Sequence, residues 1–313
     1  MGIGQKPIVV VGSINLDLVA NAEHIPLAGE TVHGSNFQMH PGGKGANQAV
    51  AVARLGYPVQ MIGQVGSDAL GEQLRSQLQT AGVGLEGVST VDGPSGVAMI
   101  VVAHQGENCI VVVSGANAEV TREYVDRYRH LIRDAGMVLT QLEIPVETVE
   151  RVAELCFEYK VPLMLDPAPA QLLPDDLLQR ISWFTPNETE SAFYAAQNGS
   201  GSQHVSADVS DTRALAQHLL ALGPSCVLLK MGSRGAYLAA QGMEKQFDAI
   251  AVDAIDTTAA GDAFNGAFAV ALLLGKDTCE STRFAVAAAA LSVTRAGAQS
   301  SMPDLQEVQR LLR

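Results

Sequence analysis

Apolar segments of strand length alternate with amphipathic segments of helix length from about residue 137 onward, and this alternation constrains the fold more than any other feature. Met137–Leu142 and Pro162–Leu165 have the composition of buried strands, and Val146–Tyr159 between them has helical periodicity. The strand-like Ile8–Gly12 and the helix-like Ala46–Leu55 begin the same layout near the start of the chain. Strands that alternate with helices predict an α/β fold whose mostly parallel sheet carries helices on both faces.

Two stretches, Asp17–Gln38 and Val97–Val113, interrupt this alternation. They contain β-type residues and turns but too little helical periodicity for a crossover helix. We expect them to form the antiparallel strands of a small lid, at about residues 14–40 and 96–113. A chain of 313 residues with 47% hydrophobic residues can bury a large core, so we expect one domain over residues 1–313 with the lid inserted in it.

The charge balance weighs against several classes of partner. The formal net charge is −13, which repels nucleic-acid phosphates and acidic membrane surfaces. The four cysteines lie too far apart in sequence for a zinc or redox motif. The first residues lack the order of a signal peptide, and the longest apolar runs are far shorter than the roughly 18 residues of a membrane span. We therefore expect a cytoplasmic protein that binds neither nucleic acid nor membrane.

The segment from Asp256 to Asp262, DTTAAGD, leads directly into a helical pattern. Unpaired N–H groups and aligned peptide dipoles make such a helix start favourable for an anion. The small residues Ala259, Ala260 and Gly261 let a phosphate approach the backbone, and Asp262 could accept a proton from a hydroxyl beside it. Acidic residues also cap helices very often, so a purely structural role for Asp262 stays open at this point.

A second glycine-rich segment, PGGKGAN, covers Pro41–Asn47 and also precedes a helix. Its glycines permit close backbone contact with a ligand, and Lys44 and Asn47 offer donors suited to hydroxyl groups. The spacing fits neither a Walker A loop nor the dinucleotide-binding fingerprint. A plain glycine turn between lid and helix is the alternative.

Polar side chains follow several predicted strands at the point where each strand ends. Asn15 and Asp17 come just after the first strand and face the same way on extended backbone, so they can hold adjacent sugar hydroxyls. Glu143 follows Met137–Leu142 in the same manner. Two further groups follow later strands, at residues 187–190 and 232–235. Each has a structural reading as a cap or turn, but together they favour a ligand site at the carboxyl edge of the sheet.

With these motifs the chain resembles the ribokinase, or PfkB, family of sugar and nucleoside kinases from about Ile8 to Pro303. Two family signatures are present in the expected order, GGKGANQAVA at Gly42–Ala51 and DTTAAGDAFNGA at Asp256–Ala267. The resemblance implies a ribokinase-like three-layer sandwich with a small β lid. It also implies transfer of the γ-phosphoryl group of ATP to a sugar hydroxyl, with O5 of D-ribose as the first candidate.

The resemblance further implies roles for individual residues. Asp262 is the expected base, with the N–H groups of Ala260, Gly261 and Asp262 as an anion hole. The expected sugar site contains Asn15, Asp17, Gly43, Lys44, Asn47, Glu143 and Asp262. The expected nucleotide site contains Asn187, Glu190, Lys230, Met231, Gly232, Ser233, Arg234, Gly235, Gly261 and Val286. Within it, Glu190 is expected to help order Mg²⁺, and Val286 replaces a polar residue that some family members place beside the adenine.

A site for a monovalent cation, K⁺ above all, is implied as well. Its expected ligands, several of them through carbonyl oxygens, are Asp256, Thr258, Ser292, Arg295, Gly297 and Ser301. Exposed lid strands would leave unpaired edges, so we also expect a homodimer formed through the lid.

Other readings remain. Deoxyribose, fructose or a nucleoside could be the substrate in place of ribose. A sugar sensor that has lost the chemistry is a second class, although the intact Asp262 argues against it. A nicotinamide-dependent dehydrogenase shares the sheet architecture but needs a glycine fingerprint after the first strand, where only Gly12 is present.

Overall fold

A central sheet organises the described part of the chain, which in this computed structural model comprises residues 5–104, 106–174, 176–197 and 211–313. Within these ranges its nine strands have the order β13-β12-β11-β10-β9-β8-β1-β4-β5. Neighbours from β5 to β11 are parallel, and β12 and β13 add antiparallel edge strands. The strands are β1 (Ile8–Val11), β4 (Val59–Gly66), β5 (Gly84–Val91), β8 (Met137–Gln141), β9 (Leu163–Asp166), β10 (Trp183–Phe184), β11 (Cys226–Lys230), β12 (Ala236–Ala240) and β13 (Met243–Phe247).

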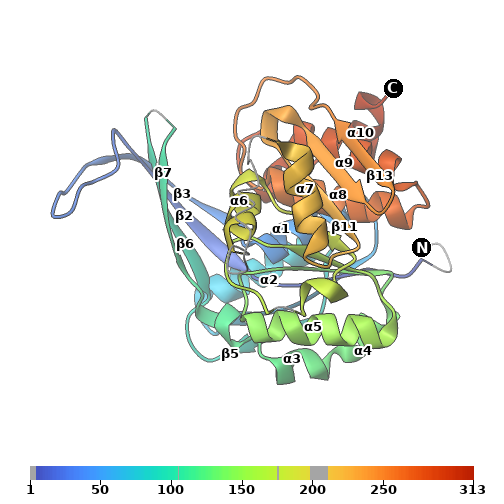
Figure 1. Ribbon diagram of the computed structural model, residues 1–313. Helices are drawn as coiled ribbons and strands as arrows, with labels where there is room; N and C mark the ends of the chain where they lie inside the picture. Colours follow the sequence, from blue (N-terminus) through green and yellow to red (C-terminus); the bar gives the residue numbers. More distant parts are fainter. Residues whose placement is uncertain (1–4, 105, 175, 198–210) are drawn as a thin grey trace.

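Helices cover both faces of this sheet, because alternate strand residues point to opposite sides. Ile8 and Val10 of β1 join one hydrophobic cluster, and Val9 and Val11 join the other. The first cluster includes residues from α1 (Lys44–Arg54), α2 (Ala69–Thr80), α8 (Ala260–Leu273), α9 (Thr278–Ser292) and α10 (Leu305–Leu311). The second includes residues from α3 (Arg122–Arg127), α4 (Arg129–Asp134), α5 (Val146–Tyr159), α6 (Glu188–Gln197) and α7 (Thr212–Ala221). The predicted sandwich of three layers is confirmed (Figure 1).

A separate four-stranded sheet forms the lid and projects from the layered body at the left of Figure 1. Its order is β3-β2-β6-β7, with β2 (Asn15–Ala22), β3 (Gly34–Gly42), β6 (Gly96–Ala103) and β7 (Asn108–Val113). The β2–β3 and β6–β7 pairs are antiparallel, as predicted. The two hairpins join through a parallel pairing of β2 with β6, which sequence patterns did not indicate.

The lid and the sheet meet beside β1. The neighbours of β1 are β4 and β8, and the chain moves outward in both directions from there, so the carboxyl end of β1 lies at the topological switch point where open α/β sheets bind ligands. α1 begins beside this point, and Gly45 in its first turn packs against β1 so closely that a Cβ would lie 2.7 Å from the carbonyl carbon of Gly12. Only glycine allows this approach, which brings the first turn of α1 to the end of β1.

Short 3₁₀ turns complete the fold: η1 (Gly115–Glu119), η2 (Leu178–Arg180), η3 (Gly232–Arg234) and η4 (Gln299–Ser301). Across the described ranges, every helix is too short or too polar to cross a lipid bilayer.

Candidate active site

The start of α8 offers unpaired backbone donors. Ala259 precedes the helix in the left-handed conformation, with φ 59°, and the first helical bond runs from the N–H of Ala263 to the carbonyl of Ala259. The N–H of Ala260 is already engaged with the carbonyl of Thr257 at 3.3 Å. Among the described residues neither the N–H of Gly261 nor that of Asp262 has an acceptor, so these two amides are the strongest candidates for binding an anion.

Asp262 lies in the first turn of α8 and is only 4% exposed. Its Oδ2 accepts a hydrogen bond from Nδ2 of Asn47 at 3.1 Å, and its Oδ1 accepts one from Nε2 of Gln48 at 3.1 Å. Burial is the main cause that raises the pKa of Asp262 to about 6, with a further upward effect from Asp166, while Lys44 opposes it most strongly. The carboxylate is therefore ionised above about pH 6 yet remains a better proton acceptor than an exposed aspartate.

The residues predicted for the sugar site lie where the lid strands β2 and β3 meet the central sheet. Asn15 is paired with Gly42 across the two strands, and its Oδ1 accepts from Nδ2 of Asn117 at 2.6 Å, which leaves its amide hydrogens as donors. Gly43 has φ 85°, and a Cβ there would lie 2.7 Å from the backbone nitrogen of Asn15. Close packing of this loop against β2 therefore requires glycine at position 43.

Acidic groups converge on this point. Burial is the largest cause that raises the pKa of Asp17 to about 7; the charges of Glu143 and Asp262 raise it further, and Lys44 lowers it. Glu143 accepts hydrogen bonds from the N–H of Lys44 at 3.0 Å and from the hydroxyl of Ser13. The carboxylates of Glu143 and Asp262 therefore lie within electrostatic range of Asp17, although the three residues are far apart in the sequence.

Lys44 provides the positive charge among these acids. Burial alone would lower the pKa of its ammonium, but four carboxylates together raise it above its usual value. In order of effect these belong to Asp262, Asp166, Glu143 and Glu190. Lys44 also lines a large cavity beside the start of α8, so it lies between that cavity and the carboxylates of the predicted sugar site.

A cavity of about 850 Å³ opens beside the start of α8. Its apolar part includes Ile250, Val252, Ala289 and Val293. Of the residues predicted for the nucleotide, the wall contains Asn187, Glu190, Lys230, Gly232, Ser233, Gly235, Gly261 and Val286. Met231 and Arg234 are not part of the wall: Met231 is buried, and Arg234 forms an ion pair with Glu188, which lines the cavity.

Four polar residues of the cavity wall form two hydrogen-bonded pairs. Nζ of Lys230 forms an ion pair with Oδ1 of Asp166 at 2.8 Å. Glu190 accepts hydrogen bonds from the N–H of Asn187 at 2.7 Å and from its Nδ2 at 2.8 Å. Burial, more than any charge, raises the pKa of Glu190. An apolar wall with cations and carboxylate oxygens at one end suits a nucleotide base, its phosphates and a hard divalent cation.

Among the residues predicted for the monovalent cation, Asp256, Thr258 and Gly297 are joined by hydrogen bonds. The carboxylate of Asp256 accepts from the N–H of Thr258 at 2.9 Å and from the N–H of Gly297 at 2.8 Å. Although burial opposes it, these bonds lower the pKa of Asp256, which therefore stays ionised. The Arg295 guanidinium forms an ion pair with Glu307 and is itself a cation, so only the carbonyl oxygen of Arg295 could bind a cation. The hydroxyls of Ser292 and Ser301 donate to carbonyl oxygens of their own turns, at 2.8 Å each, and both oxygens remain acceptors.

No described trio of His, Cys, Asp or Glu side chains has the geometry of a transition-metal centre.

Sequence reasoning did not single out Asp166, Gln48, Gln141 or Asn117. Asp166 ends β9 as Glu143 follows β8, so the rule that predicted Glu143 could have found it. Gln48 lies inside the quoted GGKGANQAVA segment, one residue after Asn47. Gln141 ends β8 as Asp166 ends β9, so the same rule could have found it. Asn117 gives no local signal, because its contacts are to residues far away in the sequence.

A PfkB-type kinase is the class that this fold and site define, and the family model described as pfkB family carbohydrate kinase matches residues 5–305. The chain belongs to this family. A ribokinase of Bacillus subtilis is 42% identical over 309 residues, which cover 98% of this chain and 100% of the relative. A structure of Arabidopsis thaliana ribokinase complexed with ribose and ATP has a TM-score of 0.88 at 38% identity and covers 99% of both chains. A deoxyribokinase of Salmonella typhi is 34% identical, covering 97% of this chain and 98% of the relative.

Proposed function

We propose that this chain catalyses the ATP-dependent phosphorylation of D-ribose at O5, giving D-ribose 5-phosphate. The observation that carries the proposal is the position of Asp262. It is a buried carboxylate at the start of α8, it lines the large cavity, and it lies within electrostatic range of Asp17 of the predicted sugar site. Full-length similarity to ribokinases, one of them complexed with ribose and ATP, supports this substrate pair.

In this proposal Asp262 accepts the proton of the attacking O5 hydroxyl as the new O–P bond forms and the bond to the leaving ADP oxygen breaks. Asn15 and Asp17 hold ribose hydroxyls, with Gly43, Asn47 and Glu143 around them. The N–H groups of Gly261 and Asp262 meet the charge of the transferred phosphoryl group.

Asn187, Glu190, Lys230 and the turn from Gly232 to Gly235 hold the nucleotide in this proposal. Mg²⁺, when bound, neutralises phosphate charge, and the carboxylate of Glu190 is the proposed partner of its water shell. Lys44 adds positive charge from the sugar side. Closure of the lid over the sugar excludes water that would otherwise hydrolyse ATP.

A panel of sugars tests the substrate. With ATP, Mg²⁺ and K⁺ present, we expect ADP release to be fastest with D-ribose and slower with 2-deoxyribose, fructose and nucleosides, because the amide of Asn15 and the carboxyl group of Asp17 are suited to two neighbouring hydroxyls. Deoxyribose is the second candidate because of the similarity to a deoxyribokinase. If kcat/KM were higher for deoxyribose, deoxyribose would replace ribose as the proposed substrate. If no sugar led to ADP release, a sugar sensor without kinase activity would be favoured.

Activation by K⁺ is the second expectation. Asp256 lies in the turn immediately before α8, so a cation held by its oxygens and nearby carbonyls would fix the backbone that presents the anion-binding amides. We expect a several-fold higher rate in K⁺ than in Na⁺ or Tris alone, since a site of carbonyl and carboxylate oxygens suits the larger ion. Equal rates in all three media would contradict the site.

The proposal includes one domain over residues 1–313, a cytoplasmic location, where ATP is supplied, and a homodimer joined through the lids. The lid presents an apolar face to solvent, with Phe37 60% and Val111 52% exposed. A second copy of the same sheet would cover this face and the unpaired strand edges. The particle mass in solution tests the dimer.

A further inference from the structure

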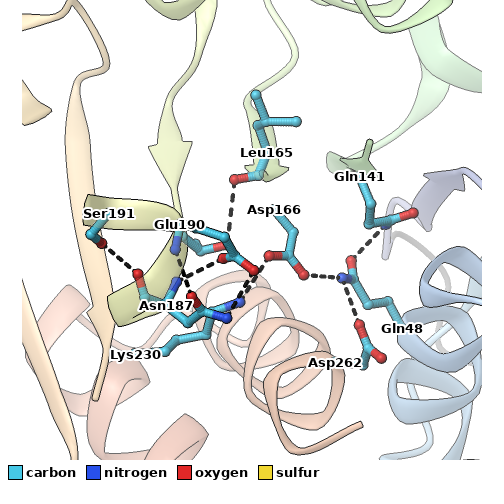
Figure 2. A network of polar contacts seen from close by, with 10 residues as sticks. Gln48, Gln141, Leu165, Asp166, Asn187, Glu190, Ser191, Lys230 and Asp262 are labelled. Carbon is cyan, nitrogen blue, oxygen red and sulfur yellow. Dashed lines mark hydrogen bonds and ion pairs between the residues drawn. The ribbon is translucent and has the colours of Figure 1, made fainter. Parts of the chain in front are cut away.

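The side chain of Gln48 lies between two buried carboxylates and touches both (Figure 2). Its Nε2 donates to Oδ2 of Asp166 at 3.0 Å and to Oδ1 of Asp262 at 3.1 Å. A carboxamide nitrogen has two hydrogens, so each carboxylate takes one of them. Gln48 is 1% exposed, which leaves no solvent to replace either bond.

The orientation of this carboxamide is fixed by a second one. Nε2 of the buried Gln141, on β8, donates to Oε1 of Gln48 at 2.8 Å. If Gln48 were flipped, its oxygen would face two carboxylates and its nitrogen would face the donor of Gln141. The backbone is held equally firmly, because a Cβ on Gly266 of α8 would lie 2.7 Å from Cβ of Ala51 and 3.2 Å from the carbonyl oxygen of Gln48.

The two carboxylates differ in charge compensation. Asp166 has an ion pair with Lys230 at 2.8 Å, and both residues line the large cavity. Asp262 forms no ion pair within 4.0 Å in the described part of the chain, and its direct partners are the neutral amides of Asn47 and Gln48. Donors to an ionised carboxylate stabilise that form, so the bond from Gln48 opposes the effects of burial and of Asp166 on Asp262.

We propose that Gln48 is a positioning residue that keeps the Asp262 carboxylate ionised and aimed, and that joins it to the Asp166–Lys230 pair on the nucleotide side of the cavity. This inference rests on the proposed role of Asp262 as the base. It adds a physical link between the sugar site and the nucleotide site. Nε2 of Gln48 donates both to Asp262, which receives the proton, and to Asp166, whose charge Lys230 compensates.

Other ionisable groups lie on the elements around Asp262. On the remaining elements packed around it, these are Lys44 of α1, Asp17 of β2, Glu143 after β8, Asp166 of β9, Glu190 of α6 and Lys230 of β11. Replacing Gln48 alone leaves all of these side chains in place, so the variants below report the loss of the hydrogen bonds that the Gln48 amide makes.

The first variant is Gln48→Met, which keeps the length of the side chain and removes both donors. In the parent, kcat/KM is expected to fall as pH drops through about 6, because Asp262 becomes protonated. A donor to an ionised carboxylate stabilises the charged form, so losing the bond from Gln48 should move this midpoint upward by about one pH unit or more. Above pH 8 a further loss of about tenfold in kcat should remain, because the carboxylate is no longer aimed.

A matched control is Gln60→Met. Gln60 lies near the amino end of β4, away from the carboxyl edge of the sheet, and its Oε1 is buried without a partner in the described part of the chain. This substitution places the same side chain at a half-buried position of the sheet, and we expect the parent's midpoint and kcat. Circular dichroism and thermal melts establish that both variants are folded.

A second measurement does not depend on turnover. The carboxyl carbon of Asp262, assigned by its disappearance in Asp262→Asn, can be titrated by ¹³C NMR in the parent and in Gln48→Met. An upward shift of about one unit supports the inference even if no sugar is phosphorylated, in which case only the proposed function fails. Equal carboxyl pKa values in the two proteins, or a pH-independent loss of activity without a shift of the midpoint, overturn the inference.

Discussion

Asp262→Asn is expected to lower kcat by about 10²–10⁴-fold, the range typical of a lost general base, while KM for ATP and for ribose changes by less than about fivefold. The carboxamide cannot accept the proton of the sugar hydroxyl, but the backbone N–H groups of residues 261 and 262 remain at the helix start. Steady-state kinetics at pH 8, where the parent carboxylate is ionised, give kcat and both KM values.

Asp134→Asn is a suitable control, since Asp134 ends α4 on the surface and contacts Arg133 rather than the site. It should match the parent in every constant. A kcat for Asp262→Asn within tenfold of the parent would remove the base role, and a large rise in KM alone would reassign Asp262 to substrate binding.

Much of the fold could be predicted because the most regular helices and strands have a clear hydrophobic pattern in their own sequence. Val146–Tyr159 was predicted with the bounds that α5 has, since its apolar residues recur with helical spacing. β5 was not predicted, because Gly84, Glu86 and Gly87 dilute its β-type pattern. The short helices α3 and α4 have little room for periodicity, and the α6 segment was seen only as polar residues after a strand.

The site also contains residues that the sequence could predict and residues that it could not. Asp262, Lys44 and Asn47 lie in local motifs of small residues before a helix, which is a signal in the sequence itself. The contact from Gln48 to Asp262 joins residues 214 positions apart, and that from Gln48 to Asp166 joins residues 118 apart. Such pairs depend on how α1 and α8 pack against the sheet, and no spacing along the chain encodes them.

Lys44→Met is expected to lower kcat/KM by about 10²–10³-fold at pH 7, as for a lost charge-stabilising donor. Lys44 is the strongest influence that lowers the pKa of Asp262, so without it the base binds its proton more tightly and is protonated at neutral pH. Part of the loss should therefore be recovered near pH 9. The part that remains at pH 9 measures the charge missing beside the phosphoryl group. Lys276→Met, at an exposed lysine after α8, should behave as the parent does.

Stability supplies an independent check on Lys44→Met. An aspartate whose pKa is higher in the folded than in the unfolded state destabilises the fold when it ionises. The cost grows as pH rises from the unfolded pKa to the folded pKa, and it stays constant above the folded pKa. For Asp262 this interval runs from 3.8 to about 6 in the parent, and loss of Lys44 extends it upward. The melting temperature of Lys44→Met should therefore fall further below that of the parent at pH 8 than at pH 5. A deficit that is equal at both pH values would mean that Lys44 does not compensate the buried acids around it.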